Sequence, residues 1–254
     1  MNFEEDLKYV IQQFKAEGIT DLILDLRFNN GGSVELARYL AASIAGTSHR
    51  SDVFMKMQRN SGADEYIRFG DGDDLNLNSV RIICSEETAS ASELIINGLR
   101  GIDFPVKLFG SRTEGKNVGM EVQEYKYGNK YYEFAPITFR SFNAKDWGDY
   151  ASGMDPDVML NNQNSDYEDD IDNVFPYAFG DWDNFDFNYP LYWALCDVQG
   201  VDPTTGEPVK RSGRSGMTRS QQDEIIRVPS VPLKRPVGTF GSLIYNKPEV
   251  ENLY

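Results

Sequence analysis

Apolar residues at the start of the chain recur with the period of a helix. They stand every three or four positions, at Phe3, Leu7, Val10, Ile11 and Phe14. This spacing predicts an amphipathic helix over residues 3–17 that ends near Gly18. The apolar-rich run over residues 19–26 predicts a buried strand directly after that helix.

Three predicted strands are each followed by a polar turn. The strand over residues 19–26 leads into the turn Asn29-Asn30-Gly31-Gly32, and apolar positions from 34 to 44 then predict a helix. The strand over residues 80–84 leads through a turn into a helix over residues 91–99. A third strand, over residues 106–109, leads into the turn at residues 110–116. Such units predict an α/β fold in which the strand ends converge on one edge of the sheet.

The rest of the chain carries weaker patterns. Residues 51–79 predict a strand and a turn rich in Gly and Asp, and alternation over residues 120–134 predicts a β-hairpin. Eight acidic residues between positions 161 and 188 predict a long acidic surface excursion, and residues 190–198 predict a closing helix. We therefore expect a core over residues 1–200 and a tail that contains Pro, Gly and Arg over residues 201–254.

Composition narrows the classes of partner. The 254 residues carry a formal net charge of −15, and 40% of them are hydrophobic, enough for a folded core. Phosphate backbones and anionic membrane surfaces require clustered Lys and Arg, so we expect no nucleic acid and no membrane contact by this chain. No apolar run reaches the ~18 residues of a membrane span, and the acidic start lacks the pattern of a signal peptide.

The cysteines and the histidine give no indication of metal binding or catalysis. Cys84 and Cys196 show no metal-ligand spacing, and we predict that both are small buried residues. The single histidine, His49, follows Gly-Thr-Ser and is predicted to lie in a surface loop rather than to act as a catalytic base.

Two ligand-binding motifs are rejected. Residues 110–116 fit the phosphate-binding pattern GxxxxGK, but Asn117 stands where Ser or Thr would hold magnesium, and a β pattern follows. The acidic stretch at residues 181–186 resembles a calcium loop, but it has Asp186 and Tyr192 where that loop needs Gly and Glu.

Together, the three polar turns carry the groups that acyl transfer requires. The second turn places Ser90 and Ser92 at a helix start, where either hydroxyl would otherwise serve only as an N-cap. The third offers the amine of Lys116, and the first offers glycine N–H groups for an oxyanion. Because burial lowers the pKa of a lysine amine toward neutrality, a lysine can accept the hydroxyl proton without any histidine.

At these residues the sequence resembles the S41 family of serine peptidases, the tail-specific or carboxyl-terminal processing proteases. The family patterns DLRxNxGG, TASASE and GxxTxGK stand here as DLRFNNGG at residues 25–32, TASASE at residues 88–93 and GSRTEGK at residues 110–116. The segment GMDPD at residues 153–157 is similar to the GxxPD that follows the family core. The resemblance runs from about residue 3 to about residue 200.

This resemblance implies a fold and a mechanism. The fold is a ClpP/crotonase-like core of ββα units, and the activity is hydrolysis of protein or peptide substrates without a metal or cofactor. Ser90 is implied as the nucleophile and Lys116 as the general base. The N–H groups of Ala91 and of Gly31 or Gly32 are implied as the oxyanion hole. The supporting motif positions are Asp25, Arg27, Asn29, Glu93, Thr113 and Gly115.

The sequence also departs from the family pattern. Many members have a glutamine four residues after the lysine, where it orients the base, whereas this chain has Met120. Most members carry a signal peptide, an N-terminal region and a PDZ domain before the core, so we expect this chain to be a truncated form. Similar members from Bacteroidetes are commonly envelope or lipid-anchored proteins, which implies an envelope, periplasmic or extracellular location.

Two other classes of function stay open. In the first, the Met120 change or truncation leaves a catalytically silent S41-like domain that holds a peptide without cutting it. The second, a crotonase-like acyl-CoA enzyme, is disfavoured, because such an enzyme uses two oxyanion N–H groups and needs no serine–lysine pair. The oligomeric state and the cleavage preference do not follow from the sequence.

Overall fold

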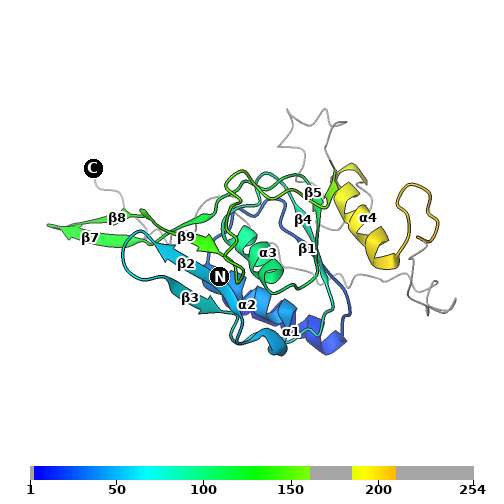
Figure 1. The fold of residues 1–254 in the computed structure, drawn as a ribbon, viewed down its shortest axis with the longest axis horizontal. Helices are drawn as coiled ribbons and strands as arrows, with labels where there is room; N and C mark the ends of the chain where they lie inside the picture. Colours follow the sequence, from blue (N-terminus) through cyan, green and yellow to red (C-terminus); the bar gives the residue numbers. More distant parts are fainter. Residues whose placement is uncertain (1–2, 161–184, 210–254) are drawn as a thin grey trace.

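A parallel sheet forms the centre of the molecule. The computed structural model describes residues 3–160 and 185–209 (Figure 1). The sheet has the strand order β1 (Leu22–Asp25), β4 (Val80–Cys84), β5 (Val106–Gly110) and β10 (Val158–Met159). All of its pairs are parallel, with Leu22 opposite Val80 and Ile83 opposite Phe109. The predicted α/β class is therefore confirmed as a mixed α/β fold with a parallel sheet.

Helices cover both faces of this sheet. Helices α2 (Val34–Ala45) and α3 (Ala91–Gly101) lie on one side, and α4 (Phe185–Gln199) lies on the other (Figure 1). Every residue of β4 is buried, because that strand is covered from both sides. Helix α1 (Phe3–Glu17) confirms the first prediction, and the short 3₁₀ turn η1 (Thr47–His49) follows α2.

A second, antiparallel sheet packs against α3. Its strand order is β3 (Glu65–Arg68), β2 (Val53–Arg59), β9 (Ile137–Phe142) and β6 (Val118–Met120). Helix α3 fits closely against β2, since a Cβ at Gly98 would stand 2.5 Å from the Phe54 ring. The fully buried core between the two sheets includes Phe54, Ile82, Ile96, Leu99 and Leu108. This packing fixes the first turn of α3, which carries Ser90 at its start.

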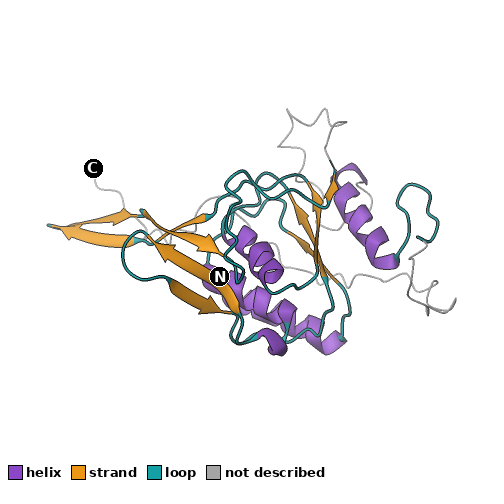
Figure 2. Cartoon of the chain, in the orientation of Figure 1, coloured by secondary structure: helices purple, strands orange, loops and turns teal. Residues whose placement is uncertain are grey.

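The predicted hairpin is present and leaves the body of the molecule. Strands β7 (Gln123–Tyr127) and β8 (Lys130–Phe134) pair only with each other and extend beyond the second sheet (Figure 2). Every residue in both strands is exposed.

Several boundaries differ from the predictions. Helix α4 begins at Phe185 and contains Pro190 as its sixth residue, whereas the prediction begins the helix at that proline. At this position the proline removes one backbone hydrogen bond of the helix. Residues 51–79 hold two strands, β2 and β3, because their polar side chains face solvent on an antiparallel sheet. The predicted strand over residues 19–26 is shortened to β1, Leu22–Asp25.

Some predictions lie outside the described residues. These are most of the acidic excursion predicted over residues 161–188, the greater part of the rejected calcium loop and most of the tail. The last four residues of that excursion, 185–188, instead form the start of α4. At the start of the predicted tail, a bridge joins Val201 to Pro208. Cys84 and Cys196 are buried, as predicted. No helix within residues 3–160 or 185–209 combines the length and the apolar character that crossing a membrane requires.

Candidate active site

The three polar turns meet at the carboxyl ends of β1, β4 and β5. The Ala89 N–H donates to the Asn29 carbonyl over 3.2 Å, which joins the second turn to the first. The Glu114 N–H donates to the Thr88 carbonyl over 3.1 Å, which joins the third turn to the second. Because the strands are parallel neighbours, residues far apart in the sequence form one cluster at this edge.

Ser90 stands at a strained bend between strand and helix. It is the N-cap of α3 and has φ 55° and ψ −115°, a conformation that favours glycine. Such backbone strain costs about 1–3 kcal/mol and is found mainly at functional positions. The bend leaves the Ser90 side chain half-buried at the sheet edge. A serine on a sharp strand-to-helix turn is a recurrent arrangement for nucleophiles.

The first glycine of the Gly31-Gly32 pair touches this bend. A Cβ on Gly31 would stand 2.8 Å from the Ser90 Cβ and 2.7 Å from the Ala91 nitrogen. The Gly31 N–H donates to Asn29 Oδ1 over 3.0 Å. Within the part of the chain that the structure describes, the N–H groups of Gly32 and Ala91 have no hydrogen-bond acceptor.

Glu93 joins the Ser90 turn to the Lys116 turn. Its Oε2 accepts from the backbone N–H groups of Ser90, at 3.0 Å, and Lys116, at 2.8 Å. Its Oε1 accepts from the Thr113 hydroxyl, at 2.6 Å, and the Gly115 N–H, at 2.8 Å. Glu93 is fully buried. Burial raises the pKa of its carboxyl above the ordinary value, and the four hydrogen bonds act in the opposite direction.

Lys116 is half-buried and lies two residues before β6. The structure places its backbone next to that of Ser90, since both donate to the same carboxylate oxygen. Among the described residues, no hydrogen bond joins the Ser90 hydroxyl to the Lys116 amine. Catalytic hydrogen bonds are often long without substrate, so this separation does not argue against the pair. Met120 lies in β6, opposite Ile137.

The other motif positions hold the turns in place. Arg27 is buried and forms an ion pair with Asp25, with 2.7 Å between Nη2 and Oδ2. Ser92 lies inside α3, and its hydroxyl donates to the carbonyl and side-chain oxygens of Asn29, each over 2.9 Å. Of the two serines considered as N-caps, Ser90 therefore holds that position and Ser92 does not, because Ser92 belongs to the helix itself.

A further segment supports the Lys116 turn. The Thr113 N–H donates to the Met154 carbonyl over 3.1 Å, and the Met154 N–H donates back to the Thr113 hydroxyl over 2.8 Å. A Cβ on Gly115 would stand 2.4 Å from the Gly153 nitrogen. The GxxPD-like segment at residues 153–157 can be recognised in the sequence, but only the fold shows that it contacts the turn at residues 110–116.

His49 takes no part in the cluster. It lies in η1, and its Nδ1 is 2.7 Å from Asp52 Oδ2. It is half-buried at the surface, in agreement with the prediction.

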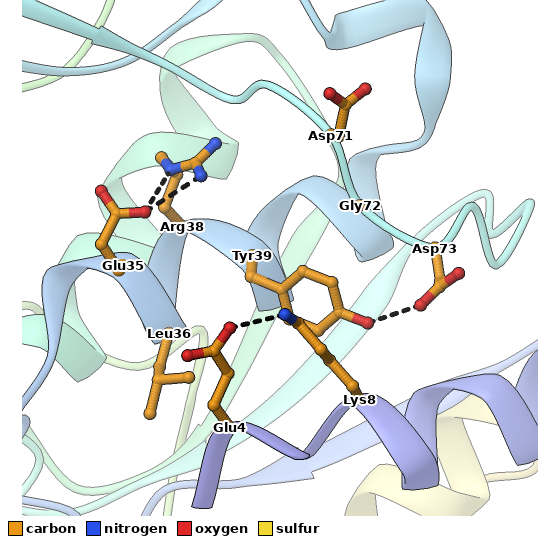
Figure 3. A pocket seen from close by; sticks show the side chains of 9 residues that line it. All are labelled: Glu4, Lys8, Glu35, Leu36, Arg38, Tyr39, Asp71, Gly72 and Asp73. Carbon is orange, nitrogen blue, oxygen red and sulfur yellow. Dashed lines mark hydrogen bonds and ion pairs between the residues drawn. The ribbon is translucent and has the colours of Figure 1, made fainter. Parts of the chain in front are cut away.

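A cavity of about 360 Å³ lies elsewhere, between α1, α2 and the loop at residues 71–73 (Figure 3). Two ion pairs line it: Lys8 with Glu4, and Arg38 with Glu35. The Tyr39 hydroxyl donates to Asp73 over 2.6 Å, and burial together with this bond raises the pKa of Tyr39 to about 12. None of the candidate catalytic residues lines this cavity.

Comparison with known proteins identifies the family of the chain. The sequence profile of Peptidase family S41 matches residues 1–160, more than half of the chain. The chain belongs to peptidase family S41. This is a family of serine-type peptidases, as the resemblance of the three motifs predicts.

This S41 chain is similar to longer proteins. It is 25% identical over 162 residues to the "probable CtpA-like serine protease" of Staphylococcus haemolyticus, covering 63% of this chain and 31% of that protein. The protein of the same name in Staphylococcus aureus is 26% identical over 181 residues, covering 70% and 35%. The chain thus spans about a third of the length of these relatives.

A solved structure shows the same fold. It is that of a Bacteroides fragilis protein described as an S41 protease, which is 24% identical to this chain and superposes with a TM-score of 0.63. The superposition covers 77% of this S41 chain and 49% of the other.

Proposed function

We propose that this chain is a serine endopeptidase in which Ser90 is the nucleophile and Lys116 the general base. The observation that carries the proposal is the shared Glu93 oxygen, which holds the backbones of Ser90 and Lys116 side by side. Membership of the S41 family supports the same reaction class. Glu93 is a positioning residue in this scheme, because it contacts both turns and no reacting atom.

The reaction proceeds through an acyl-enzyme. The neutral Lys116 amine accepts the Ser90 hydroxyl proton while Oγ attacks the scissile carbonyl carbon. The oxyanion then collapses, the C–N bond breaks, and the leaving amine takes the proton from the Lys116 ammonium. Water next attacks the ester carbonyl, again giving its proton to Lys116, and Ser90 is released with the proton restored.

The oxyanion requires donors that are not already engaged. In the proposal these are the N–H groups of Ala91 and of the glycine pair. Gly32 is the better candidate within that pair, because the Gly31 N–H donates to Asn29. The role of Gly31 is different: because it has no side chain, the first turn can approach Ser90 closely.

The proposal extends to the wider setting of the chain. Its core, over residues 1–200, is of the ClpP/crotonase-like type, its substrates are proteins or peptides, and its location is the cell envelope, the periplasm or the exterior. These statements rest on the resemblance to the S41 family.

The test is cleavage of an unfolded reporter protein, read by mass spectrometry of the products. We expect Ser90→Ala to abolish cleavage and labelling by a fluorophosphonate, with a loss of stability of no more than about 1 kcal/mol. Ser111→Ala is the matched control, because it removes a hydroxyl from the neighbouring turn and leaves Ser90 in place. That variant should still cleave the reporter protein and should still be labelled by the fluorophosphonate.

Lys116→Arg tests the base separately. Arginine keeps the positive charge and much of the length but cannot give up its proton at these pH values. We expect activity to fall at least about 100-fold, within the range attributed to general-base catalysis. If Lys116→Arg cleaves as well as the parent chain, lysine is not the base. Failure of the parent chain to cleave or to be labelled would favour the catalytically silent peptide-binding domain.

A further inference from the structure

The β7–β8 hairpin presents an uncovered aromatic surface. In an antiparallel pair, residues directly opposite each other share a face. Tyr125 pairs with Tyr132, Gln123 with Phe134 and Tyr127 with Lys130. One side of the hairpin therefore carries four aromatic residues, which we call the aromatic face: Tyr125, Tyr127, Tyr132 and Phe134. Their side chains are 61%, 71%, 42% and 57% exposed, in that order.

The opposite face has a different character. It carries Glu124, Lys126, Tyr131 and Glu133, and the Lys126 amine lies 5.0 Å from the centre of the Tyr131 ring. Only one tyrosine stands there, beside three charged side chains. Because a two-stranded hairpin alone is marginally stable in water, the aromatic face on the other side is suited to a partner that covers it.

The base of the hairpin is fixed to the body. Arg59 on β2 forms an ion pair with Glu121, just before β7, with 2.9 Å between Nη1 and Oε2. The Asn60 side chain donates to the Ile137 carbonyl over 2.8 Å, just after the hairpin. Both strands are thus held where they leave the second sheet, which gives the aromatic face a defined position.

The hairpin follows Lys116, the candidate general base, closely along the chain. Lys116 lies two residues before β6, and β7 begins at Gln123. The seven residues from one to the other span at most ~24 Å, at ~3.4 Å per residue when fully extended. A bound polypeptide can therefore cover this reach with about seven of its own residues.

We propose that the aromatic face binds an extended, unfolded segment of the polypeptide substrate. The inference rests on the proposed peptidase function and adds a substrate-binding surface outside the catalytic turns. Tyrosine suits this task, since it offers a large amphipathic contact at low conformational cost and accepts varied sequences. Within the described structure the outer edges of β7 and β8 are unpaired, so their backbone groups are open to an added strand.

The size of the face favours a peptide over a second copy of the chain. Five residues by two strands measure ~17 Å by ~10 Å. The aromatic face has only four residues, whereas a stable protein–protein interface takes about 20–30 residues from each partner. A single extended segment, about one strand wide, is a partner of the matching size.

The test measures binding without cleavage. The full chain carrying Ser90→Ala is titrated against fluorescein-labelled, reduced and carboxymethylated α-lactalbumin, and Kd is read by fluorescence anisotropy. Adding Tyr125→Ser should weaken binding about fivefold. Tyr131→Ser is the matched control, because both tyrosines are 61% exposed on the same hairpin but lie on opposite faces. The control should change Kd less than twofold.

The active chain provides a second readout. There, Tyr125→Ser should raise KM for unfolded α-lactalbumin about fivefold with kcat unchanged. KM for a peptide of about four residues should not move, because such a peptide, ~14 Å long when extended, leaves little chain beyond the catalytic turns for the aromatic face to bind.

Three results overturn the inference. They are equal losses in the Tyr125 and Tyr131 variants, no probe binding by the Ser90→Ala chain, and a dimer that Tyr125→Ser dissociates while Kd for the probe stays the same. Because the anisotropy experiment needs no catalysis, absence of cleavage by the parent chain counts against the proposed function alone. Normal cleavage with an unchanged Kd counts against the aromatic face alone.

Discussion

Gly31 lies so close to Ser90 that no side chain fits between them. Its φ of +100° is also one that residues with a Cβ rarely adopt. The strained Ser90 bend and this glycine therefore depend on each other, because the bend is held partly by the close approach of the first turn. Glu93 completes the arrangement from the other side by accepting the Ser90 N–H.

We expect Gly31→Ala to destabilise the protein more than Gly62→Ala does. Gly62 has nearly the same φ, +98°, but no atom lies within 4 Å of the place that a Cβ would take there. Both variants bear the backbone strain, whereas only Gly31→Ala adds an overlap, which costs about 2 kcal/mol more. Urea denaturation of the two variants measures this difference. Equal losses of unfolding free energy would show that the Ser90 bend moves freely to make room.

Helix α4 is attached to the parallel sheet by charges as well as by apolar packing. Asp197 accepts from Arg81 on β4 and Lys107 on β5, with 3.0 Å between Arg81 Nε and Oδ2. Burial alone would raise the pKa of Asp197, but the bonds from Lys107 and Arg81 outweigh it and hold the pKa below 3.8. The group therefore stabilises the fold above its unfolded pKa, and this contribution is lost as pH falls through the folded value.

Asp197→Asn tests this attachment. We expect a loss of about 2 kcal/mol in unfolding free energy at pH 7, because Arg81 is left partly buried with one partner fewer. The difference from the parent chain should shrink as the pH is lowered below 3.8, where the aspartate is protonated in the unfolded chain. Asp103→Asn removes an exposed ion pair with Lys145 and should cost less than about 0.5 kcal/mol. A difference that does not vary with pH would rule out the carboxylate as its source.

The elements can be predicted where one physical signal dominates. The spacing of apolar residues and the flanking glycines predict α1, α2, β4 and α3, because burial of apolar side chains governs those segments. Residues 51–79 are harder, since β2 and β3 keep polar side chains on the solvent side. The predicted start of α4 is displaced because a proline is typical of the first position of a helix, whereas Pro190 is the sixth residue of α4, where a proline is unfavourable.

The site can be predicted only in part. Polar turns after strands predict that the residues gather at one edge, since parallel strands impose it. No sequence period predicts that one Glu93 oxygen serves both Ser90 and Lys116, or that Met154 holds Thr113. These contacts join residues that are distant in the chain, and they depend on how the two sheets pack.

The whole molecule is strongly acidic. The net charge of −15 at pH 7 creates a negative field that extends about 10 Å into solution at 0.1 M salt. Such a field raises the rate at which oppositely charged polypeptides arrive and lowers it for acidic ones. Substrate charge should therefore influence capture independently of the residues at the cleavage point.

We expect binding of a basic unfolded polypeptide to the Ser90→Ala chain to weaken with salt. Between about 0.02 M and about 0.3 M NaCl, the association rate should fall about tenfold for a Lys-rich peptide, because the field is screened. A peptide of the same length with Lys replaced by Gln is the control and should vary less than about twofold. Stopped-flow fluorescence measures both rates. An identical salt response for the two peptides would contradict electrostatic capture.

The contacts that hold the candidate catalytic turns also determine when those turns can form during synthesis. Gly31, Glu93 and Gly115 come from successive strand–turn units, and Thr113 is held both by Glu93 and by Met154. A chain emerging from the ribosome has made Ser90 and Lys116 long before residue 154 is available. Until that segment arrives, the Lys116 turn lacks its two hydrogen bonds to Met154, so under the proposed function the Ser90–Lys116 pair would reach its final geometry only after residue 154 has been made.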